Sequence, residues 1–121
     1  MYQYREVMLG NRKKDKGILV IEFDDPQMKI VGEFLMADGA LLGESLLHDM
    51  KEVLGGRKPE IKVSGNRCGL HIQKETTIIN DLLSDLYHDM TGLEAYTIET
   101  SLLKNLLEEW LQVRQEYYAP S

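Results

Sequence analysis

Three aspartates recur at every fourth position in the segment DLLSDLYHD, which runs from residue 81 to residue 89. If this segment is helical, the carboxylates of Asp81, Asp85 and Asp89 lie along one face, because residues four apart are neighbours on a helix. Such like-charge neighbours cost a helix about 0.2–0.5 kcal/mol per pair, and the negative end of the helix dipole disfavours Asp89 further. A face that destabilises its own helix indicates a use, and we expect it to bind a basic partner.

The competing interpretation is a solvated face on an acidic protein, because such faces are common and keep a protein soluble. We retain binding as the hypothesis to be tested. The predicted partner-binding residues are Asp81, Asp85, Asp89 and Glu94.

Two short segments, LLHDM ending at Met50 and LYHDM ending at Met90, raise the question of a duplicated metal site. On a helix each residue turns by about 100°, so His48 points roughly 200° away from Leu46 and its apolar stripe. Adjacent His and Asp side chains also diverge by about 100° and do not chelate one ion together. The matching residues upstream, 28–36 and 68–76, have different patterns. We therefore interpret the segments as two amphipathic helices with polar outer faces.

Weaker chemical patterns are also present. Glu44, His48 and Glu52 would align on one helix face, but a metal site would need further ligands from elsewhere. Cys68 and His71 would be a nucleophile and base only with a carboxylate to orient the histidine, and the sequence shows no obvious one. The chain has no Gly-rich phosphate loop, no GxSxG and no CxxC motif. We predict no catalytic residues, no metal site and no cofactor.

The elements that position these residues begin with β-structure. Residues 2–7 alternate in polarity and residues 18–23 form an apolar, β-branched run, so both are predicted strands. The polar segment 10–17 between them is a predicted hairpin loop. Residues 24–26, Asp-Asp-Pro, predict a turn into a third strand at 28–35. Three strands joined by short turns predict an antiparallel meander.

A helix is predicted from Ala40 to Leu54, with apolar residues at spacings of three and four and two glycines after its end. Alternating residues at 61–64 and 70–73 predict a second hairpin, and 76–79 continue that edge or form another short strand. Residues 95–98 are a final predicted strand.

Two further helices complete the pattern. Asn80 is the expected cap of a short helix that runs to about Met90. Thr100 is the expected cap of the longest helix, whose apolar stripe includes Trp110, which we expect to be buried. The fold class predicted for residues 1–121 is therefore a single α+β domain.

Charge limits the partners. The net charge is −6, with 14 basic against 20 acidic residues, and it is unevenly distributed. Residues 1–17 hold five basic and two acidic residues, whereas residues 76–121 hold two basic and eight acidic residues. An acidic half disfavours nucleic acid and anionic lipid and favours a basic protein. The basic segment Arg12–Lys16 has no interleaved aromatic residues for base stacking, so we interpret it as a solvated loop.

Localisation follows from three observations. No apolar run approaches the roughly 18 residues of a membrane span. The N-terminus lacks the layout of a signal peptide. The single cysteine, Cys68, forms no internal disulfide, which agrees with a reducing compartment. We expect a cytoplasmic protein.

The segment YTIETSLLKNLLEEWLQVRQEYY, residues 96–118, resembles the C-terminal end of several small acidic bacterial proteins, some of them immunity proteins of toxin systems. In those proteins a strand runs into Thr-x-x-Leu and then into an amphipathic helix that carries a tryptophan. The resemblance implies structural roles for Thr100, Leu103 and Trp110. It implies nothing about the binding surface, which varies within such proteins.

The leading hypothesis is a non-enzymatic module that binds a basic protein through its acidic helix face, as an immunity-type inhibitor of a toxin. One alternative is a small enzyme or small-ligand protein with a cleft between the sheet and the helix at 40–54. Another is a housekeeping adaptor or a homodimer without a toxin. Partner identity and strand order are not determined by the sequence.

Overall fold

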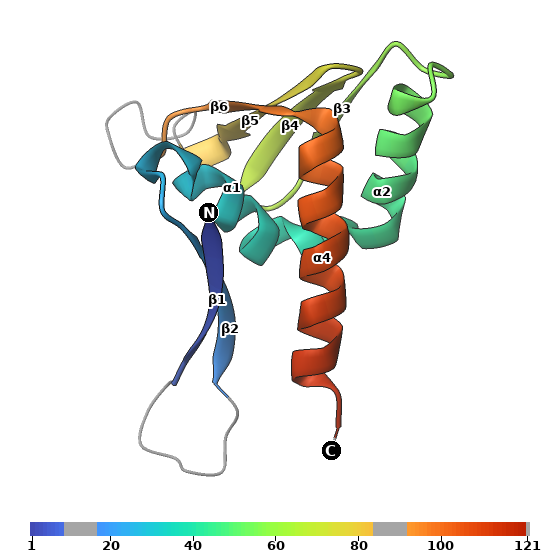
Figure 1. The fold of residues 1–121 in the computed structure, drawn as a ribbon. Coiled ribbons are helices and arrows are strands. Elements are labelled where there is room, and N and C mark those ends of the chain that lie inside the picture. The colour runs from blue at the N-terminus through green and yellow to red at the C-terminus, as the bar shows by residue number, and fades with distance from the viewer. Residues whose placement is uncertain (9–16, 84–91, 121) are drawn as a thin grey trace.

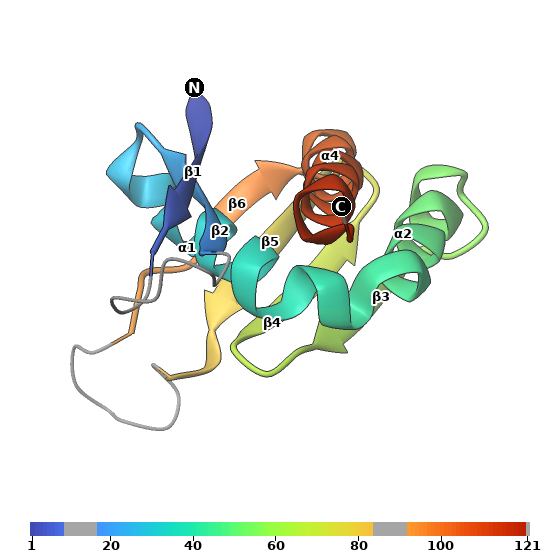
Figure 2. The ribbon, with the colours of Figure 1, turned by 90° about the horizontal axis from the view of Figure 1, so that it is seen from below.

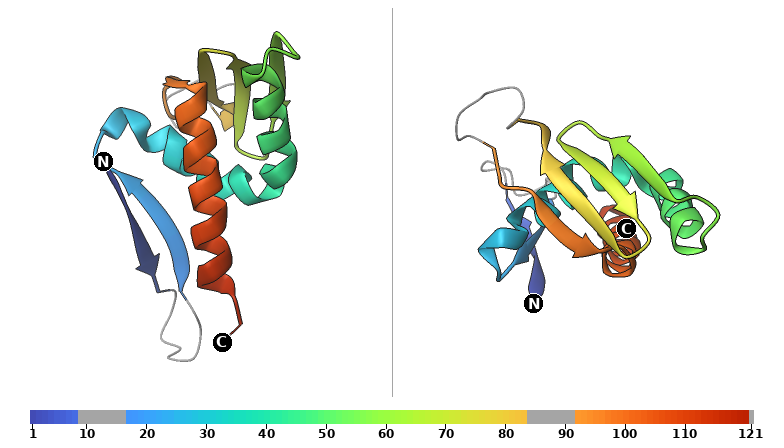
Figure 3. Two further views of the ribbon diagram at one scale, coloured as in Figure 1. Left: turned by 45° about the vertical axis from the view of Figure 1, so that its right-hand side comes forward. Right: turned by 90° about the horizontal axis from the view of Figure 1, so that it is seen from above.

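The computed structural model of the protein describes residues 1–8, 17–83 and 92–120. Its centre is a four-stranded antiparallel sheet in the order β3-β4-β5-β6. Three helices pack on one face of this sheet, which lies in front of them in the right-hand view of Figure 3. The predicted α+β class is confirmed. The strands are β3 (Glu60–Ser64), β4 (Cys68–Gln73), β5 (Thr76–Asp81) and β6 (Tyr96–Glu99), and the helices are α1 (Lys29–Phe34), α2 (Ala40–Leu54) and α4 (Thr100–Tyr118).

Alternation along the strands explains why the sheet has one covered face. In β4 the side chains of Leu70 and Ile72 are buried under the helices, whereas Gln73 is exposed and His71 is half-buried. The inward faces of α2 and α4 supply the other half of the core, with Met50 and Leu107 fully buried. The predicted hairpin, the strand at 76–79, the final strand and both long helices are confirmed.

A separate two-stranded ribbon of β1 (Tyr2–Val7) and β2 (Ile18–Phe23) projects from the sheet and runs beside the C-terminal half of α4 (Figure 1). The Tyr4 ring stacks on Trp110 with a centroid distance of 6.3 Å and an interplanar angle of 13°. The Tyr118 hydroxyl accepts a hydrogen bond from the Leu19 N–H at 3.2 Å. The N-terminal ribbon is thus held by the C-terminal helix. Trp110 is 2% exposed, as predicted.

The predicted third strand at 28–35 is wrong, because this segment is helical. Asp25 accepts a hydrogen bond from the Gln27 N–H at 2.9 Å and caps a 3₁₀ turn, Pro26–Met28, which leads into α1. An aspartate cap followed by proline at the first helical position is a helix start, although we interpreted it as a turn between strands. The N-terminal part is consequently a two-stranded ribbon and not a three-stranded meander.

The path from α1 into α2 is bent twice. A π-helical turn, Leu35–Gly39, connects the two helices, and Gly43 inside α2 has φ +41°. Because L side chains rarely adopt this backbone conformation, glycine at position 43 permits the kink. The bends turn α2 back alongside α4, as seen from below in Figure 2.

Thr100 does not cap α4, contrary to expectation. Glu99 occupies the cap position without a side-chain hydrogen bond, and Thr100 is the first helical residue. The Thr100 hydroxyl donates to the Gln73 carbonyl at 2.5 Å and lies 2.8 Å from the Thr77 hydroxyl. This buried pair of threonines fastens the start of α4 to the end of β4 and to β5.

The expected cap at Asn80 is also wrong. Asn80 belongs to β5, and its side chain lies over Gly69 on the neighbouring strand, where a Cβ would stand 2.8 Å from the Asn80 Oδ1. Helical backbone starts at Leu82 and Leu83. The rest of the predicted short helix, with Asp85, His88 and Asp89, lies outside the described residues, as does the loop Arg12–Lys16.

Candidate partner-binding site

Asp81, the first residue of the predicted acidic stripe, ends β5 and points inward. It is 2% exposed, and its carboxylate accepts two hydrogen bonds from the Arg67 guanidinium, Nε to Oδ1 at 3.1 Å and Nη2 to Oδ2 at 3.0 Å. The N–H of Leu83 donates to Oδ1 at 3.0 Å, and the N–H of Leu93 donates to Oδ2 at 2.8 Å. Asp81 therefore joins residues that precede and follow the segment 84–91.

These four hydrogen bonds control the ionisation of Asp81. The bonds from Arg67, followed by those from the two backbone amides, lower the pKa of Asp81 to about 2 against the opposing effect of burial. The Arg67 pKa is raised in turn, chiefly by its hydrogen bonds to Asp81. Both side chains are charged throughout the physiological range. The expectation that Asp81 shows an exposed carboxylate on a helix face is wrong.

A second buried aspartate fixes the main chain around Arg67. Asp38, in the π-helical turn, accepts hydrogen bonds from the N–H groups of Asn66 at 2.7 Å, Arg67 at 3.2 Å and Cys68 at 2.8 Å. Gly65 leaves room for this carboxylate, because a Cβ there would lie 2.3 Å from the Asp38 Cγ. The β3–β4 turn is thus formed around Asp38.

Asp38 and Arg67 were not predicted from the sequence. A signal was present for Asp38, since it is a lone charge within the apolar run FLMADGALL. Charged residues are rarely buried unless they are paired or hydrogen-bonded, so an isolated carboxylate in a buried segment predicts a set of donors. Nothing in the sequence identifies which donors they are.

Glu94 lies on the rim of a groove of about 360 Å³ between the start of α1 and the chain that leads into β6. The groove is mainly apolar, and Pro26, Ile30 and Leu93 contribute to its walls. Glu94 itself is exposed. A partner side chain that enters here would meet apolar walls with a carboxylate at the edge.

Two more carboxylates precede the α1 side of this groove in the chain. Asp24 and Asp25, both exposed, come directly before Pro26, and the Asp24 N–H donates to the Met1 carbonyl at 3.0 Å. We call Asp24, Asp25 and Glu94 the acidic corner. Lys29 is the basic side chain that lines the same groove. Three carboxylates against one ammonium make the corner complementary to a cation.

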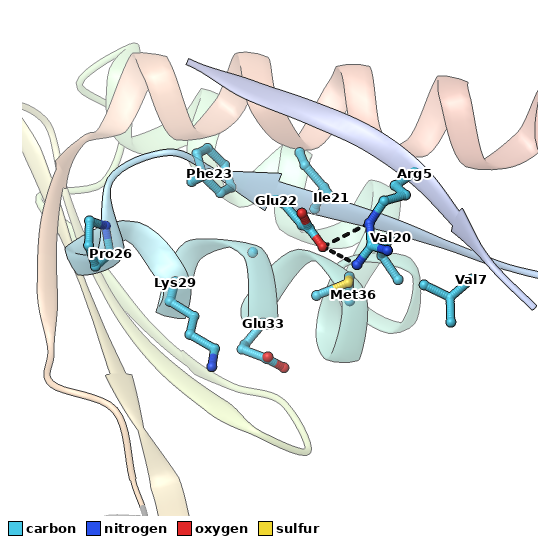
Figure 4. Close-up of a pocket in the computed structure, with 11 residues that line it drawn as sticks. Arg5, Val7, Val20, Ile21, Glu22, Phe23, Pro26, Lys29, Glu33 and Met36 are labelled. Carbon is cyan, nitrogen blue, oxygen red and sulfur yellow. Dashed lines mark hydrogen bonds and ion pairs between the residues drawn. The ribbon is translucent and has the colours of Figure 1, made fainter.

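A second concavity, also of about 360 Å³, lies on the other side of Pro26 and Lys29, between α1 and the outer face of the ribbon (Figure 4). Val7, Val20 and Met36 are among its apolar lining residues, and the ion pair of Arg5 and Glu22 spans one side. Among the described residues, none that line it is a histidine or a cysteine. The two concavities share Pro26 and Lys29 as lining residues and are therefore neighbours on the surface.

The space between α2 and the sheet, expected as a cleft in one alternative, is filled. Leu46, Met50 and Val53 of α2 are almost fully buried, and so are Leu70 and Ile72 of the facing strand. These side chains belong to the main core and leave no room there for a substrate.

The structure separates Cys68 from His71. Cys68 is buried, and burial with the nearby charges of Asp38 and Asp81 raises the pKa of its thiol to about 12. His71 is three residues further along the same strand and faces the other side of the sheet, where its Nε2 lies 2.7 Å from the Glu60 carboxylate. A carboxylate partner for His71 thus exists, contrary to expectation, but the thiol is protonated and out of reach.

The helix face of Glu44, His48 and Glu52 is a solvent face, as predicted. His48 is largely exposed, its Nε2 lies 3.4 Å from the Glu52 carboxylate, and Glu52 is paired with Arg57. Within residues 1–8, 17–83 and 92–120 there is no group of three or more His, Cys, Asp or Glu placed to hold a metal ion. The described helices include none that is long and apolar enough to cross a membrane.

Comparison with known proteins adds one decisive observation. The chain is 32% identical over 91 residues to a protein of Bacillus cereus named "Immunity protein", and the match covers 75% of this chain and 74% of that relative. The chain belongs to the family of this immunity protein. The expected resemblance to immunity-type proteins is therefore confirmed. No protein-family model and no solved structure matches the chain.

Family membership changes how the site is interpreted. The acidic corner and the two adjoining concavities are the candidate surface for a partner. Of the predicted binding residues, Glu94 lies in this surface and Asp81 lies beneath it. Asp85 and Asp89 fall between these two positions in the chain, outside the described residues.

Proposed function

We propose that this chain is a cytoplasmic immunity protein that binds a basic toxin and blocks its activity through the acidic corner. The observation that carries the proposal is the 32% identity to the Bacillus cereus immunity protein over three quarters of both chains. The charge of the corner and the chain's net charge of −6 support a basic partner.

The predicted residues Asp85, Asp89 and Glu94 make the contact in this proposal, together with Asp24 and Asp25. Negative charge around a binding surface speeds encounter with a basic protein and disfavours wrong partners. The apolar groove beside Glu94 suits the aliphatic stem of an arginine or lysine, whose charged end then reaches the carboxylates. Asp81 is already paired with Arg67 and takes no direct part in binding.

A growth assay tests the function. The proteins encoded by the genes on either side of this chain's gene in its native genome are expressed one at a time in a bacterial host, with and without this chain. We expect one of them to arrest growth and the chain to restore it. The purified pair should then form a one-to-one complex in size-exclusion chromatography.

The same assay separates the alternatives. If neither neighbouring protein is toxic, or if the chain fails to restore growth, the toxin-binding function is wrong. A homodimeric peak without a partner in chromatography would then favour the adaptor or homodimer hypothesis.

A further inference from the structure

We propose that the ion pair between Arg67 and the buried Asp81 positions the acidic corner by holding the main chain at Leu93, the residue before Glu94. This inference rests on the proposed function, since it concerns how the toxin-binding surface is held in shape. Arg67 and Asp81 are thus positioning residues and do not touch the toxin.

We call the set of four hydrogen bonds that Asp81 accepts the clamp. The two carboxylate oxygens of Asp81 receive four N–H groups, two from Arg67 and one each from Leu83 and Leu93. Leu83 and Leu93 are ten positions apart in the chain, yet both amides meet the same carboxylate. Because the Asp81 side chain binds both amides, it fixes the distance between Leu83 and Leu93.

Arg67 is itself held in place from two directions. Its carbonyl accepts a hydrogen bond from the Leu82 N–H at 2.9 Å, and its own N–H donates to Asp38. The guanidinium also lies 3.8 Å from the Glu33 carboxylate of α1, the helix that contributes a wall to each concavity. The pair therefore connects the helix on one side of the groove with the chain on the other.

Stability alone does not account for this arrangement. Cys68 and Asp81 are already paired in the β4–β5 ladder, so the sheet reaches this position without the side-chain bonds. An ion pair with a buried carboxylate gives little net stability compared with apolar residues of similar size, because the buried charge loses its hydration. The pair instead fixes the position of the main chain at Leu93. Leu93 and Glu94 line the groove and lie in irregular structure before β6.

Amide hydrogen exchange measured by NMR on the whole chain tests the clamp without a toxin. In Asp81→Asn and Arg67→Gln, exchange at the Leu83 and Leu93 amides should speed up at least tenfold, while the core amide of Ile72 keeps its protection. Arg57→Gln, which breaks an exposed arginine–glutamate pair on another part of the molecule, is the matched control and should change none of the three. Unchanged exchange at Leu93 in both clamp variants would overturn the proposal.

Affinity for the toxin found in the growth assay then tests positioning. Asp81→Asn should weaken binding about tenfold in the natural chain but less than threefold when Glu94→Gln is already present, because the clamp acts through Glu94. A merely structural role would give the same loss in both backgrounds and would contradict the inference. If Glu94→Gln alone leaves the affinity unchanged, the acidic corner is wrong as the binding surface, and that failure is distinct from failure of the clamp.

Discussion

Asp81 has a carboxylate whose charged form is stabilised by a guanidinium and two backbone amides in a buried site. The pKa falls from its ordinary value of 3.8 to about 2, so the native state holds this group ionised where the unfolded chain would protonate it. The resulting stabilisation is fully present above the unfolded value and is lost as the pH falls through the folded value.

We predict that Asp81→Asn changes the acid stability of the protein. A lowering of the pKa from 3.8 to about 2 corresponds to about 2 kcal/mol of stabilisation at neutral pH. The difference in unfolding free energy between the natural chain and Asp81→Asn should therefore shrink by about 2 kcal/mol between pH 5 and pH 2. Urea denaturation at a series of pH values measures it, and a difference that is constant with pH would contradict the account.

Cys68 provides a second prediction at this scale. Its thiol is buried and its pKa is raised to about 12, so almost no thiolate exists at pH 8. A chromogenic thiol reagent should label the folded protein far more slowly than the protein in denaturant. Fast labelling of the folded chain at pH 8 would show that the thiol is accessible and ionised, and would restore Cys68 as a candidate nucleophile.

The residue types at the site could be predicted from the sequence only in part. Spacing alone identified a negatively charged segment, and Glu94 does lie on the surface of a groove. The inward direction of Asp81 was missed because it depends on β5 extending to residue 81, where alternation points the side chain under the sheet toward Arg67. A long-range partner of this kind leaves no pattern in the chain.

The helical elements differ in how well their sequences define them. α2 was predicted with its observed bounds and α4 with a start one residue late, because each shows a long apolar stripe with period 3.6. α1 was taken for a strand because it is short and contains the β-branched residues Ile30 and Val31, which are buried together with Phe34. Its charged residues, Lys29 and Glu33, lie four apart as on one helix face, but a single pair does not establish a period. The cap at Asp25 and Pro26 was the clearer helix signal.

At the β3–β4 turn we predict the effect of adding one methyl group, the side chain of alanine, at position 65. In Gly65→Ala the new Cβ would lie 2.3 Å from the Asp38 Cγ. The Asp38 carboxylate must then move away and lose the hydrogen bonds that it accepts from three backbone amides. We expect a loss of about 3 kcal/mol in unfolding free energy, since charge-assisted hydrogen bonds in buried sites are lost together.

Gly43→Ala is the matched comparison, because an added Cβ there meets nothing within 4 Å but the backbone has φ +41°. It should cost only about 1–2 kcal/mol through backbone strain. Thermal unfolding of both variants measures the two losses, and a Gly65→Ala variant as stable as the natural chain would refute the role of Asp38.

The whole molecule is connected by contacts between its two ends. Tyr2 and Tyr4 of the first strand contact Glu109 and Trp110 of the last helix, and the Tyr117 hydroxyl donates to Glu6. These pairs are about a hundred residues apart in the chain, so neither the placement of the ribbon nor the strand order could be derived from local patterns. Charge asymmetry, by contrast, can be read directly from the sequence, and the basic partner that it predicts stays a prediction.

The central claim is that this immunity-family chain binds a basic toxin through its acidic corner and the segment beside it. The direct test is the dissociation constant of the toxin complex at several salt concentrations, for a variant with four carboxylates neutralised and for a control with the same charge change elsewhere. The test variant carries Asp24→Asn, Asp85→Asn, Asp89→Asn and Glu94→Gln, and the control carries Glu44→Gln, Glu75→Gln, Glu99→Gln and Glu116→Gln.

The control places its substitutions on exposed residues of α2, α4, the β4–β5 turn and β6. The account predicts that the test variant binds at least a hundredfold more weakly, with a flatter dependence on salt, because each exposed or partly desolvated charge pair contributes roughly 0.5–1 kcal/mol or more. The control should bind almost as tightly as the natural chain. Equal affinity of the test variant and the natural chain would contradict the claim.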